Sequence, residues 1–229
     1  MDIKKLTEKK LAGMFDHTNL KAFADEKMME KLCREAKEYT FAMVAINSVQ
    51  VKRCKELLAG SPVHVGAAIS FPLGQTTIEA KVFETQDAIQ NGADEIDYVV
   101  NLTEVKEKNW DYVRREMESI VGICREAGVI SKVIFENCYL EKEEIRKLSQ
   151  IAREVKPDFI KTSTGFGTGG ALPEDVALMK ETVGDLVRVK AAGGIRDWES
   201  CRRMIEAGAE RIGTSASIAI LEGFKAAEK

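Results

Sequence analysis

The sequence has few of the features that mark metal enzymes, disulfide-stabilised domains and membrane proteins. With only two histidines, His17 and His64, metal catalysis through histidine ligands is disfavoured, and we expect no metal and no cofactor. The five cysteines are scattered and form no CxxC pair, so they predict reduced, buried thiols rather than a disulfide framework or a zinc site. No window approaches the roughly 18 apolar residues of a membrane span, and we expect a cytoplasmic protein without a signal peptide.

The sequence also has no excess of either charge. Its 34 Lys and Arg residues stand against 37 Asp and Glu residues, which gives a net charge of −3, and no basic run is longer than a few residues. This balance argues against non-specific nucleic-acid binding and against an electrostatic membrane anchor. Aromatic residues make up 7% of the 229 residues, but 45% are apolar, which is enough for the core of one large domain. We therefore expect small-molecule partners, with no nucleic acid and no membrane.

Short apolar or β-branched runs alternate with longer amphipathic runs along the whole chain. The short runs predict eight strands, at residues 13–17, 41–47, 63–71, 95–101, 132–137, 159–163, 187–192 and 211–214. The longer runs predict helices at residues 25–39, 49–59, 76–91, 105–127, 141–155, 173–182, 198–207 and 218–227. Strict alternation of eight such units favours an α/β fold of one domain over residues 1–229. This domain is a single (β/α)₈ TIM barrel with an extra short N-terminal helix.

An open doubly wound sheet is the alternative fold. Against it, no GxGxxG segment follows the first predicted strand, and no shift in composition marks a second domain. In a barrel, active-site groups lie at the C-terminal ends of the strands and in the loops that follow. This rule predicts one rim that carries a set of mostly polar residues, namely Asp16, His17, Asn47, Phe71, Asp97, Glu136, Lys161, Lys190 and Ser215.

Two lysines, Lys161 and Lys190, stand near the ends of consecutive predicted strands. Burial disfavours the charged form of a lysine, and a second ammonium group nearby lowers the pKa further. A lysine that is neutral near pH 7 can attack a carbonyl group and form a Schiff base. Two alternatives stay open from the pattern alone. In the first, the stem of Lys161 packs in the core while its amine reaches solvent. In the second, Lys190 binds a phosphate directly.

A carboxylate on a third strand completes a candidate proton relay. Glu95 and Asp97 project to the same side of their strand, so Asp97 can face both lysines as a general acid or base. A structural salt bridge inside the barrel explains the same pattern. The residues predicted to extend this charged network are Asp16, Lys132 and Glu136. Of these, Lys132 and Glu136 share a face of their strand and are predicted to orient other groups rather than to react.

Glycine-rich segments follow the last three predicted strands, at residues 162–170, 192–196 and 212–217. Backbone N–H groups of such loops can bind phosphate, and in barrels the loops after the seventh and eighth strands often form a phosphate site. The simpler explanation is that the glycines allow tight turns between strand and helix. Together the three segments predict a phosphorylated substrate.

Several segments resemble the motifs of the deoxyribose-phosphate aldolase family, and they follow one another in the family's order. The two most specific are Lys161-Thr162-Ser163-Thr164-Gly165-Phe166-Gly167 and Lys190-Ala191-Ala192-Gly193-Gly194-Ile195-Arg196. Segments 15–18, 71–74, 92–97, 132–136 and 211–215 also match. The resemblance implies a class I, metal-free aldolase, a carbon–carbon lyase. Such an enzyme reversibly cleaves 2-deoxy-D-ribose 5-phosphate to D-glyceraldehyde 3-phosphate and acetaldehyde in deoxyribose phosphate catabolism.

The resemblance also implies a role for each matching position. Lys161 would form the imine, Asp97 and Lys190 would move protons, and Asp16 would help to position the substrate. The phosphate group would be held by Gly165, Gly193, Gly194, Gly213 and Ser215. The supporting residues would be Lys132, Glu136 and Thr162.

The sequence departs from the family pattern at a few positions. Ala45-Ile46-Asn47-Ser48 stands where Cys-Val-Asn-Pro is common, Asn19 replaces an apolar residue, and Ser70 replaces a glycine. The changes at Ala45 and Asn19 are expected to alter one wall of the site. Another Schiff-base aldolase or transaldolase therefore stays open, as does a non-catalytic barrel that senses a phosphorylated metabolite. A homo-oligomer, dimer or tetramer, is also compatible with the sequence, because such barrels often pair through their outer helices.

Overall fold

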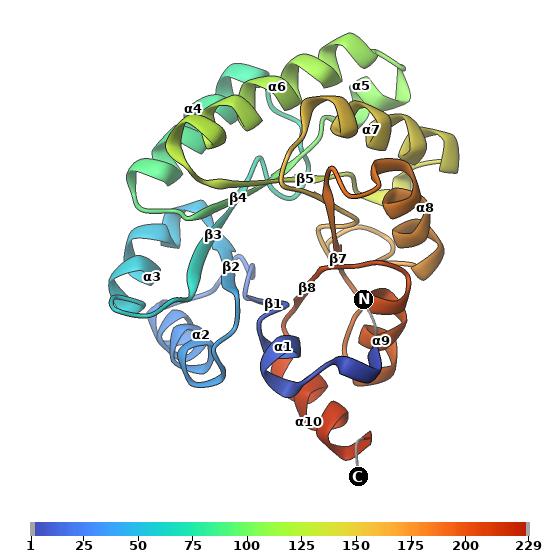
Figure 1. The fold of residues 1–229 in the computed structure, drawn as a ribbon. Helices are drawn as coiled ribbons and strands as arrows, with labels where there is room; N and C mark the ends of the chain where they lie inside the picture. The colour runs from blue at the N-terminus through green and yellow to red at the C-terminus, as the bar shows by residue number, and fades with distance from the viewer. Residues whose placement is uncertain (1–2, 228–229) are drawn as a thin grey trace.

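The strands of the computed structural model, which describes residues 3–227, close into one barrel (Figure 1). All eight are parallel and pair in sequence order, and β1 also pairs with β8, so the sheet has no free edge. This confirms the predicted (β/α)₈ barrel and excludes the open doubly wound sheet. The strands are β1 (Phe15–Thr18), β2 (Met43–Asn47), β3 (His64–Ile69), β4 (Glu95–Val99), β5 (Ile130–Ile134), β6 (Phe159–Lys161), β7 (Arg188–Ala192) and β8 (Arg211–Thr214).

Helices surround the barrel and cover the outer face of the sheet (Figure 1). They are α2 (Glu26–Tyr39), α3 (Val51–Leu57), α4 (Ile78–Gln90), α6 (Trp110–Ala127), α7 (Lys142–Val155), α8 (Pro173–Val183), α9 (Trp198–Glu206) and α10 (Ser217–Ala227). The predicted extra N-terminal helix is present as α1 (Glu8–Ala12), which follows the 3₁₀ turn η1 (Ile3–Lys5). Two further 3₁₀ turns, η2 (Ser48–Gln50) and η3 (Asn137–Tyr139), follow β2 and β5.

The prediction of one helix at residues 105–127 is wrong. The structure has two helices there, the short helix α5 (Leu102–Lys106) and the long helix α6, which are separated by a break. Lys108 in this break has a φ of 59°, which a continuing helix cannot contain. The side chain of Asn109 accepts a hydrogen bond from the N–H group of Tyr112 and so caps the start of α6.

Four strands end two or three residues earlier than their apolar runs predict. β4 ends at Val99 and β6 ends at Lys161, although the predicted strands reached residues 101 and 163. β3 ends at Ile69 and β5 ends at Ile134, although the predicted strands reached residues 71 and 137. Ser70 and Glu136, which follow these strands, have φ values of 49° and 57°, in the left-handed region that a strand does not use. The apolar residues beyond these points therefore belong to loops at the mouth of the barrel.

The two faces of the sheet differ in chemistry. Outward-facing side chains such as Ile96, Ile160 and Ile212 pack against the helices in a continuous apolar core. The alternate residues face the barrel axis, where barrels usually carry Val, Ile and Leu. Here this interior instead holds buried charges such as Asp97 and Lys161, and burying them requires close pairing.

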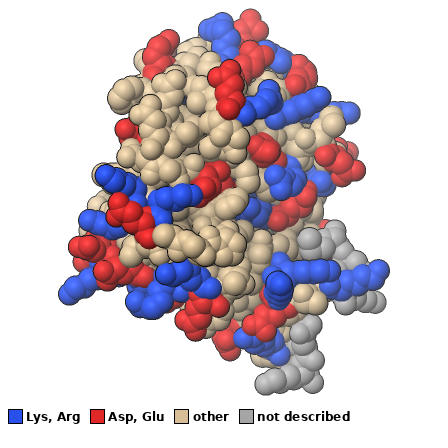
Figure 2. All heavy atoms as spheres, turned by 60° about the vertical axis from the view of Figure 1, so that its left-hand side comes forward, with Lys and Arg blue, Asp and Glu red and all other residues tan. Residues whose placement is uncertain are grey.

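The surface carries both charges in mixture. Figure 2 shows Lys and Arg side chains interspersed with Asp and Glu side chains over the face that holds the left-hand helices of Figure 1. No continuous basic patch appears on that face, as the balanced composition predicts. Across residues 3–227, no helix combines the length and the apolar character needed to cross a membrane.

Candidate active site

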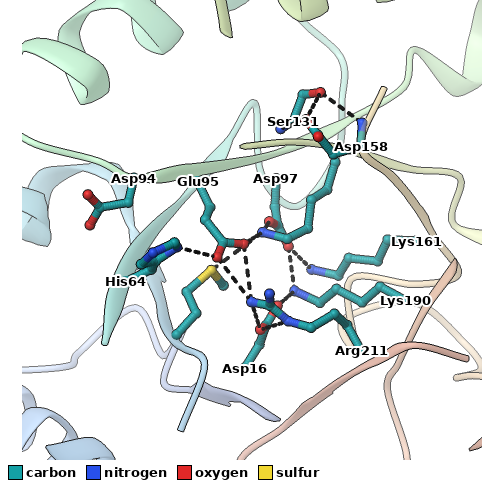
Figure 3. Close-up of polar contacts among 12 residues, drawn as sticks. Asp16, His64, Asp94, Glu95, Asp97, Ser131, Asp158, Lys161, Lys190 and Arg211 are labelled. Atoms are coloured by element: carbon teal, nitrogen blue, oxygen red, sulfur yellow. Dashed lines mark hydrogen bonds and ion pairs between the residues drawn. The ribbon is translucent and has the colours of Figure 1, made fainter. Parts of the chain in front are cut away.

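Seven ionisable side chains from six strands form one buried network inside the barrel (Figure 3). Four of them are cations and three are carboxylates. The cations are Lys132 on β5, Lys161 on β6, Lys190 on β7 and Arg211 on β8. The carboxylates are Asp16 on β1 and Glu95 and Asp97 on β4.

Asp97 lies at the centre of the part of the network nearest the barrel mouth. Its Oδ2 atom is 2.9 Å from Lys161 Nζ and 2.7 Å from Lys190 Nζ, and its Oδ1 atom is 2.6 Å from Lys132 Nζ. Lys161 and Lys190 are register partners on β6 and β7. The structure thus confirms that the two lysines are neighbours, and one carboxylate bridges them.

Glu95 and Asp16 form the rest of the network. Glu95 contacts Lys132, lies 3.1 Å from Arg211 Nη2, and lies 2.8 Å from Nδ1 of the half-buried His64. Asp16 contacts Lys190 and accepts a 2.8 Å hydrogen bond from Arg211 Nε. Each carboxylate therefore binds at least two cations. Within residues 3–227, no three His, Cys, Asp or Glu side chains are grouped so that they could hold a metal ion.

Lys161 is a cation of the network whose pKa is lowered. Burial lowers the pKa of Lys161 to about 8, and the ammonium groups of Lys190 and Lys132 add to this effect while Asp97 opposes it. Burial acts on Lys132 too, but Asp97 and Glu95 outweigh it and raise the Lys132 pKa. If Lys161 loses its proton, three cations face three carboxylates. A neutral Lys161 therefore leaves the buried network without excess charge.

The pKa of Asp97 shifts in the direction that keeps this residue ionised. Burial alone would raise its pKa, but the ammonium groups of Lys132, Lys161 and Lys190 outweigh burial and hold it well below the ordinary value. Asp97 is therefore a carboxylate at neutral pH, able to accept hydrogen bonds from both lysines at once.

A cavity of about 300 Å³ opens above this network at the C-terminal ends of β1, β6, β7 and β8. Of the seven network residues, Lys161 lines it, whereas Asp16, Asp97, Lys132 and Lys190 lie behind its wall. The lining residues are Thr18, Asn19, Leu20, Lys21, Lys161, Thr164, Gly165, Phe166, Ala192, Gly193, Gly194, Ile195, Arg196, Gly213, Thr214 and Ser215. A small molecule in this cavity can therefore reach one amine of the network directly.

All five residues predicted to bind phosphate line the same cavity. Gly165, Gly193 and Gly194 have φ values of 87°, 88° and 77°, which glycine adopts without strain. Gly213 and Ser215 belong to the segment that leads into α10, whose first residue, Ser217, follows Ser215 by two positions. Backbone N–H groups and a helix N-terminus therefore gather at one end of the cavity, an arrangement that favours an anion.

Two of the predicted supporting residues fix the loop after β6. Glu136 accepts a hydrogen bond from the Thr164 N–H group at 3.1 Å and a second one from the Thr164 hydroxyl. Thr162 Oγ1 lies 3.2 Å from Ala192 O and accepts a 3.1 Å hydrogen bond from Ala192 N, which ties β6 to β7. Lys132, the third supporting residue, belongs to the ionic network. Glu136 was also predicted to extend this network, but it binds the loop after β6 instead.

The sequence interpretation missed several residues of this region. Arg211, which contacts two carboxylates of the network, was not predicted as a site residue. Its charge within the otherwise uncharged strand 211–214 could have indicated it. Lys21 and Arg196, which line the cavity, lie in loops where no pattern distinguishes a binding cation from a solvated one. Of the departures from the family pattern, Asn19 lines the cavity, but Ala45 does not.

Comparison with known proteins gives consistent results over nearly the whole chain. The DeoC/LacD family aldolase model matches residues 11–224. A deoxyribose-phosphate aldolase of Lactobacillus acidophilus is 60% identical over 221 residues, which cover 96% of this chain and 93% of the relative. A deoxyribose-phosphate aldolase of Bacteroides thetaiotaomicron is 54% identical, and the match covers 99% of this chain and 95% of the relative. The tetrameric deoxyribose phosphate aldolase structure from Aeropyrum pernix superposes with a TM-score of 0.89 at 33% identity. The superposition covers 96% of this chain and 93% of that structure's chain. The chain therefore belongs to the DeoC/LacD family of aldolases and is a carbon–carbon lyase built on a TIM barrel.

Proposed function

We propose that this enzyme is a class I deoxyribose-phosphate aldolase whose Lys161 forms a Schiff base with the substrate, without a metal or a cofactor. The observation that carries this proposal is the position of Lys161. It lines the cavity, it is buried, and it shares a carboxylate with a second lysine 2.7 Å from the same oxygen. A pKa of about 8 gives it a substantial neutral fraction near physiological pH. The names of the relatives support 2-deoxy-D-ribose 5-phosphate as the substrate.

The first chemical step is addition of the neutral Lys161 amine to the C1 aldehyde of the open-chain sugar. The resulting carbinolamine loses water and becomes a protonated imine, whose positive nitrogen attracts electrons from the neighbouring carbons. Lys190 and Asp97 lie behind Lys161 and are placed to accept and return the protons that these steps release and consume.

Cleavage then breaks the bond between C2 and C3 of the sugar. A base removes the proton of the C3 hydroxyl, C3 becomes the aldehyde of D-glyceraldehyde 3-phosphate, and the electron pair of the broken bond moves toward the imine to give an enamine. Protonation of the enamine at C2 and hydrolysis of the imine release acetaldehyde and regenerate Lys161. We assign the proton transfers to the Lys190–Asp97 pair.

In this proposal Asp16 acts through Lys190 rather than on the substrate. Its carboxylate is completely buried and contacts Lys190 and Arg211, whereas the carboxylate that contacts the cavity-lining Lys161 is Asp97. A carboxylate in this position holds the Lys190 ammonium group near Asp97. Substrate positioning, the role implied by the family resemblance, is then indirect.

The phosphate group of the substrate is proposed to bind at the glycine-rich end of the cavity. Gly165, Gly193, Gly194 and Gly213 supply backbone N–H groups, and Ser215 supplies a hydroxyl. Lys21 and Arg196 line the same cavity and add positive charge toward a dianion. Phosphate at this end leaves the aldehyde end of the sugar toward Lys161.

Borohydride trapping tests the proposal directly. Incubation with acetaldehyde and sodium borohydride is expected to add the mass of one reduced imine to the wild type and nothing to Lys161→Ala. The wild type is expected to release acetaldehyde from 2-deoxy-D-ribose 5-phosphate. Trapping without turnover of this sugar, but with turnover of another sugar phosphate in a panel, would identify a different Schiff-base aldolase. Tight phosphosugar binding without trapping or turnover would identify a sensor.

We also propose that the protein works as a homo-oligomer in deoxyribose phosphate catabolism in the cytoplasm. Large apolar side chains that are mostly solvent-exposed support an interface between copies: Phe23, Val49, Leu73 and Phe83 are each at least 69% exposed. Light scattering of the purified protein tests the assembly, and a monomeric mass at micromolar concentration would contradict it.

A further inference from the structure

Outside the barrel, a second buried ion pair contacts the strand that carries Asp97. Lys81 of α4 and Glu116 of α6 are both completely buried, and Lys81 Nζ lies 2.6 Å from Glu116 Oε1. The two helices pack against each other and flank β4 (Figure 1). Both side chains lie on the helix-facing side of the sheet, so they have no access to the cavity.

Each member of the pair also binds one backbone group at the end of β4. Lys81 Nζ donates a 2.7 Å hydrogen bond to Val99 O, and Glu116 Oε2 accepts a 3.0 Å hydrogen bond from Asn101 N. Val99 and Asn101 follow Asp97 by two and four residues. The ion pair therefore holds the chain directly after the residue that bridges the two lysines.

These backbone groups need such partners because β3 ends too early to provide them. The β3–β4 pairing stops at Ile69 and Tyr98, and Ser70 turns away with a φ of 49°. On the other edge, β4 stays attached to β5 through a hydrogen bond from Val100 N to Ile134 O. Without the side-chain bonds, the buried Val99 O and the Asn101 N–H group would lack strand partners at this edge.

Stability alone does not explain a charged pair at this place. Desolvation of two buried charges offsets their attraction, and an apolar pair of similar volume often serves the fold equally well. An apolar pair, however, cannot bind a carbonyl oxygen and an N–H group of the strand. What this pair provides beyond packing is a fixed position for the end of β4.

We propose that Lys81 and Glu116 are positioning residues that hold the end of β4 and thereby keep the Asp97 carboxylate between Lys161 and Lys190. Asp97 makes three contacts of 2.6–2.9 Å, so a small shift of β4 breaks at least one of them. The inference rests on the proposed function, because it assigns the pair to the proton relay of the aldolase reaction.

The test is the double variant Lys81→Met/Glu116→Leu, which keeps the volume but removes both backbone contacts. We expect a folded barrel whose kcat for 2-deoxy-D-ribose 5-phosphate is about tenfold to a hundredfold lower. KM should change by less than about threefold, because the glycine loops are untouched. Since Asp97 raises the Lys161 pKa, its displacement should also move the acidic limb of the kcat/KM profile to lower pH.

Two further variants complete the test. The control is Arg114→Met/Glu154→Leu, which removes a partly exposed 2.6 Å ion pair between α6 and α7. This control should change neither kcat nor the pH profile. Lys81→Gln/Glu116→Gln keeps a donor and an acceptor without charge and should recover most of the lost kcat. If the apolar variant does not fold, the second variant is Lys81→Met/Glu116→Gln. It keeps an acceptor for Asn101 N and loses the ion pair and the contact to Val99 O, and it should show the same loss and the same pH shift.

A folded apolar variant with wild-type kcat and pH profile would overturn the inference. So would a loss of activity that follows only the melting temperature and is not recovered by the glutamine pair. Failure of the proposed function has a different signature, because the wild type itself would then give neither a trapped imine nor acetaldehyde.

Discussion

Lys161 and Lys190 are register partners on neighbouring strands, and both ammonium groups bind the same atom, Asp97 Oδ2, at 2.9 and 2.7 Å. One carboxylate oxygen thus serves two cations, while Asp97 Oδ1 binds a third, Lys132. Because the other carboxylates of the network are also shared, four cations compete for three negative charges. Loss of the proton of Lys161, which lines the cavity, leaves three cations for three carboxylates.

The first prediction concerns the pH dependence of imine formation. With a pKa of about 8, Lys161 is about one tenth neutral at pH 7 and about nine tenths neutral at pH 9. The initial rate of borohydride-trapped imine formation with acetaldehyde should therefore rise about tenfold between these pH values and level off above them. A flat profile from pH 6 to 9 would contradict the neutral-amine assignment, and Lys161→Ala gives the background.

The second prediction concerns Lys190. Lys190→Leu removes one of the charges that lower the Lys161 pKa, so the acidic limb of the kcat/KM profile should move to higher pH. It also removes the proposed proton-transfer group, and kcat should fall by about 10²- to 10⁴-fold. Steady-state assays across pH measure both effects.

A matched control separates these effects from a general loss of a lysine. Lys180→Leu removes a partly exposed amine on α8 that pairs with Glu210 at 2.9 Å, far from the network. This variant should keep the wild-type profile. If Lys190→Leu also kept the wild-type turnover, Lys190 would have no part in the relay.

The third prediction is that Lys161 destabilises the fold at neutral pH. The pKa of Lys161 is about 8 in the folded protein and about 10.4 in the unfolded chain, so the unfolded state binds more protons between these pH values. The wild type should therefore become more stable as pH rises from 8 to 10. At pH 7 the penalty is about 3 kcal/mol. Lys161→Met should raise the free energy of unfolding by up to this amount at pH 7 and by little at pH 10.

Denaturant titration at the two pH values measures this difference. The control is Lys180→Met. Burial lowers the pKa of the partly exposed Lys180, but Glu210 and Asp185 together outweigh burial and raise it. Lys180→Met should not stabilise the protein at pH 7. A Lys161→Met variant that is less stable than the wild type at pH 7 would show that the ion pair with Asp97 outweighs the desolvation of Lys161.

Much of the fold and of the candidate site followed from local sequence patterns. Alternating short apolar and longer amphipathic runs predicted the barrel because each element must bury one face against the other layer. The period of two along β4 placed Glu95 and Asp97 on one side, and both face the network. Charges inside apolar strands marked Lys161 and Lys190, because such charges are costly unless they are paired.

What the sequence did not predict depends on distant contacts. Arg211 and Asp16 are 195 residues apart in the chain, and only closure of β8 against β1 brings them together. Likewise, the premature end of β3 depends on Ser70, whose N–H group donates to Glu84 of α4 at 2.8 Å. Neither contact leaves a periodic signal in the chain, so the end of β3 and the ion pair between Arg211 and Asp16 could not be located from pattern alone.

The last prediction concerns the phosphate end of the cavity. At Gly193, where φ is 88°, an added Cβ would lie 3.1 Å from Gly170 Cα, so Gly193→Ala should displace the glycine loops. Loss of one charge-assisted hydrogen bond should raise KM for 2-deoxy-D-ribose 5-phosphate about tenfold to a hundredfold. For unphosphorylated 2-deoxyribose, kcat/KM should change less than about threefold, since Lys161 keeps its surroundings.

Gly60→Ala is the control for backbone strain in this comparison. Gly60 has a φ of 74° in the turn between α3 and β3, and an added Cβ would meet no atom within 4 Å. The two variants thus share an unfavourable φ, but only Gly193 lines the cavity. Gly60→Ala should leave both substrates unaffected, as judged by steady-state kinetics. Equal losses for the phosphorylated and unphosphorylated sugars in Gly193→Ala would place the phosphate elsewhere, because strain alone acts on both reactions alike.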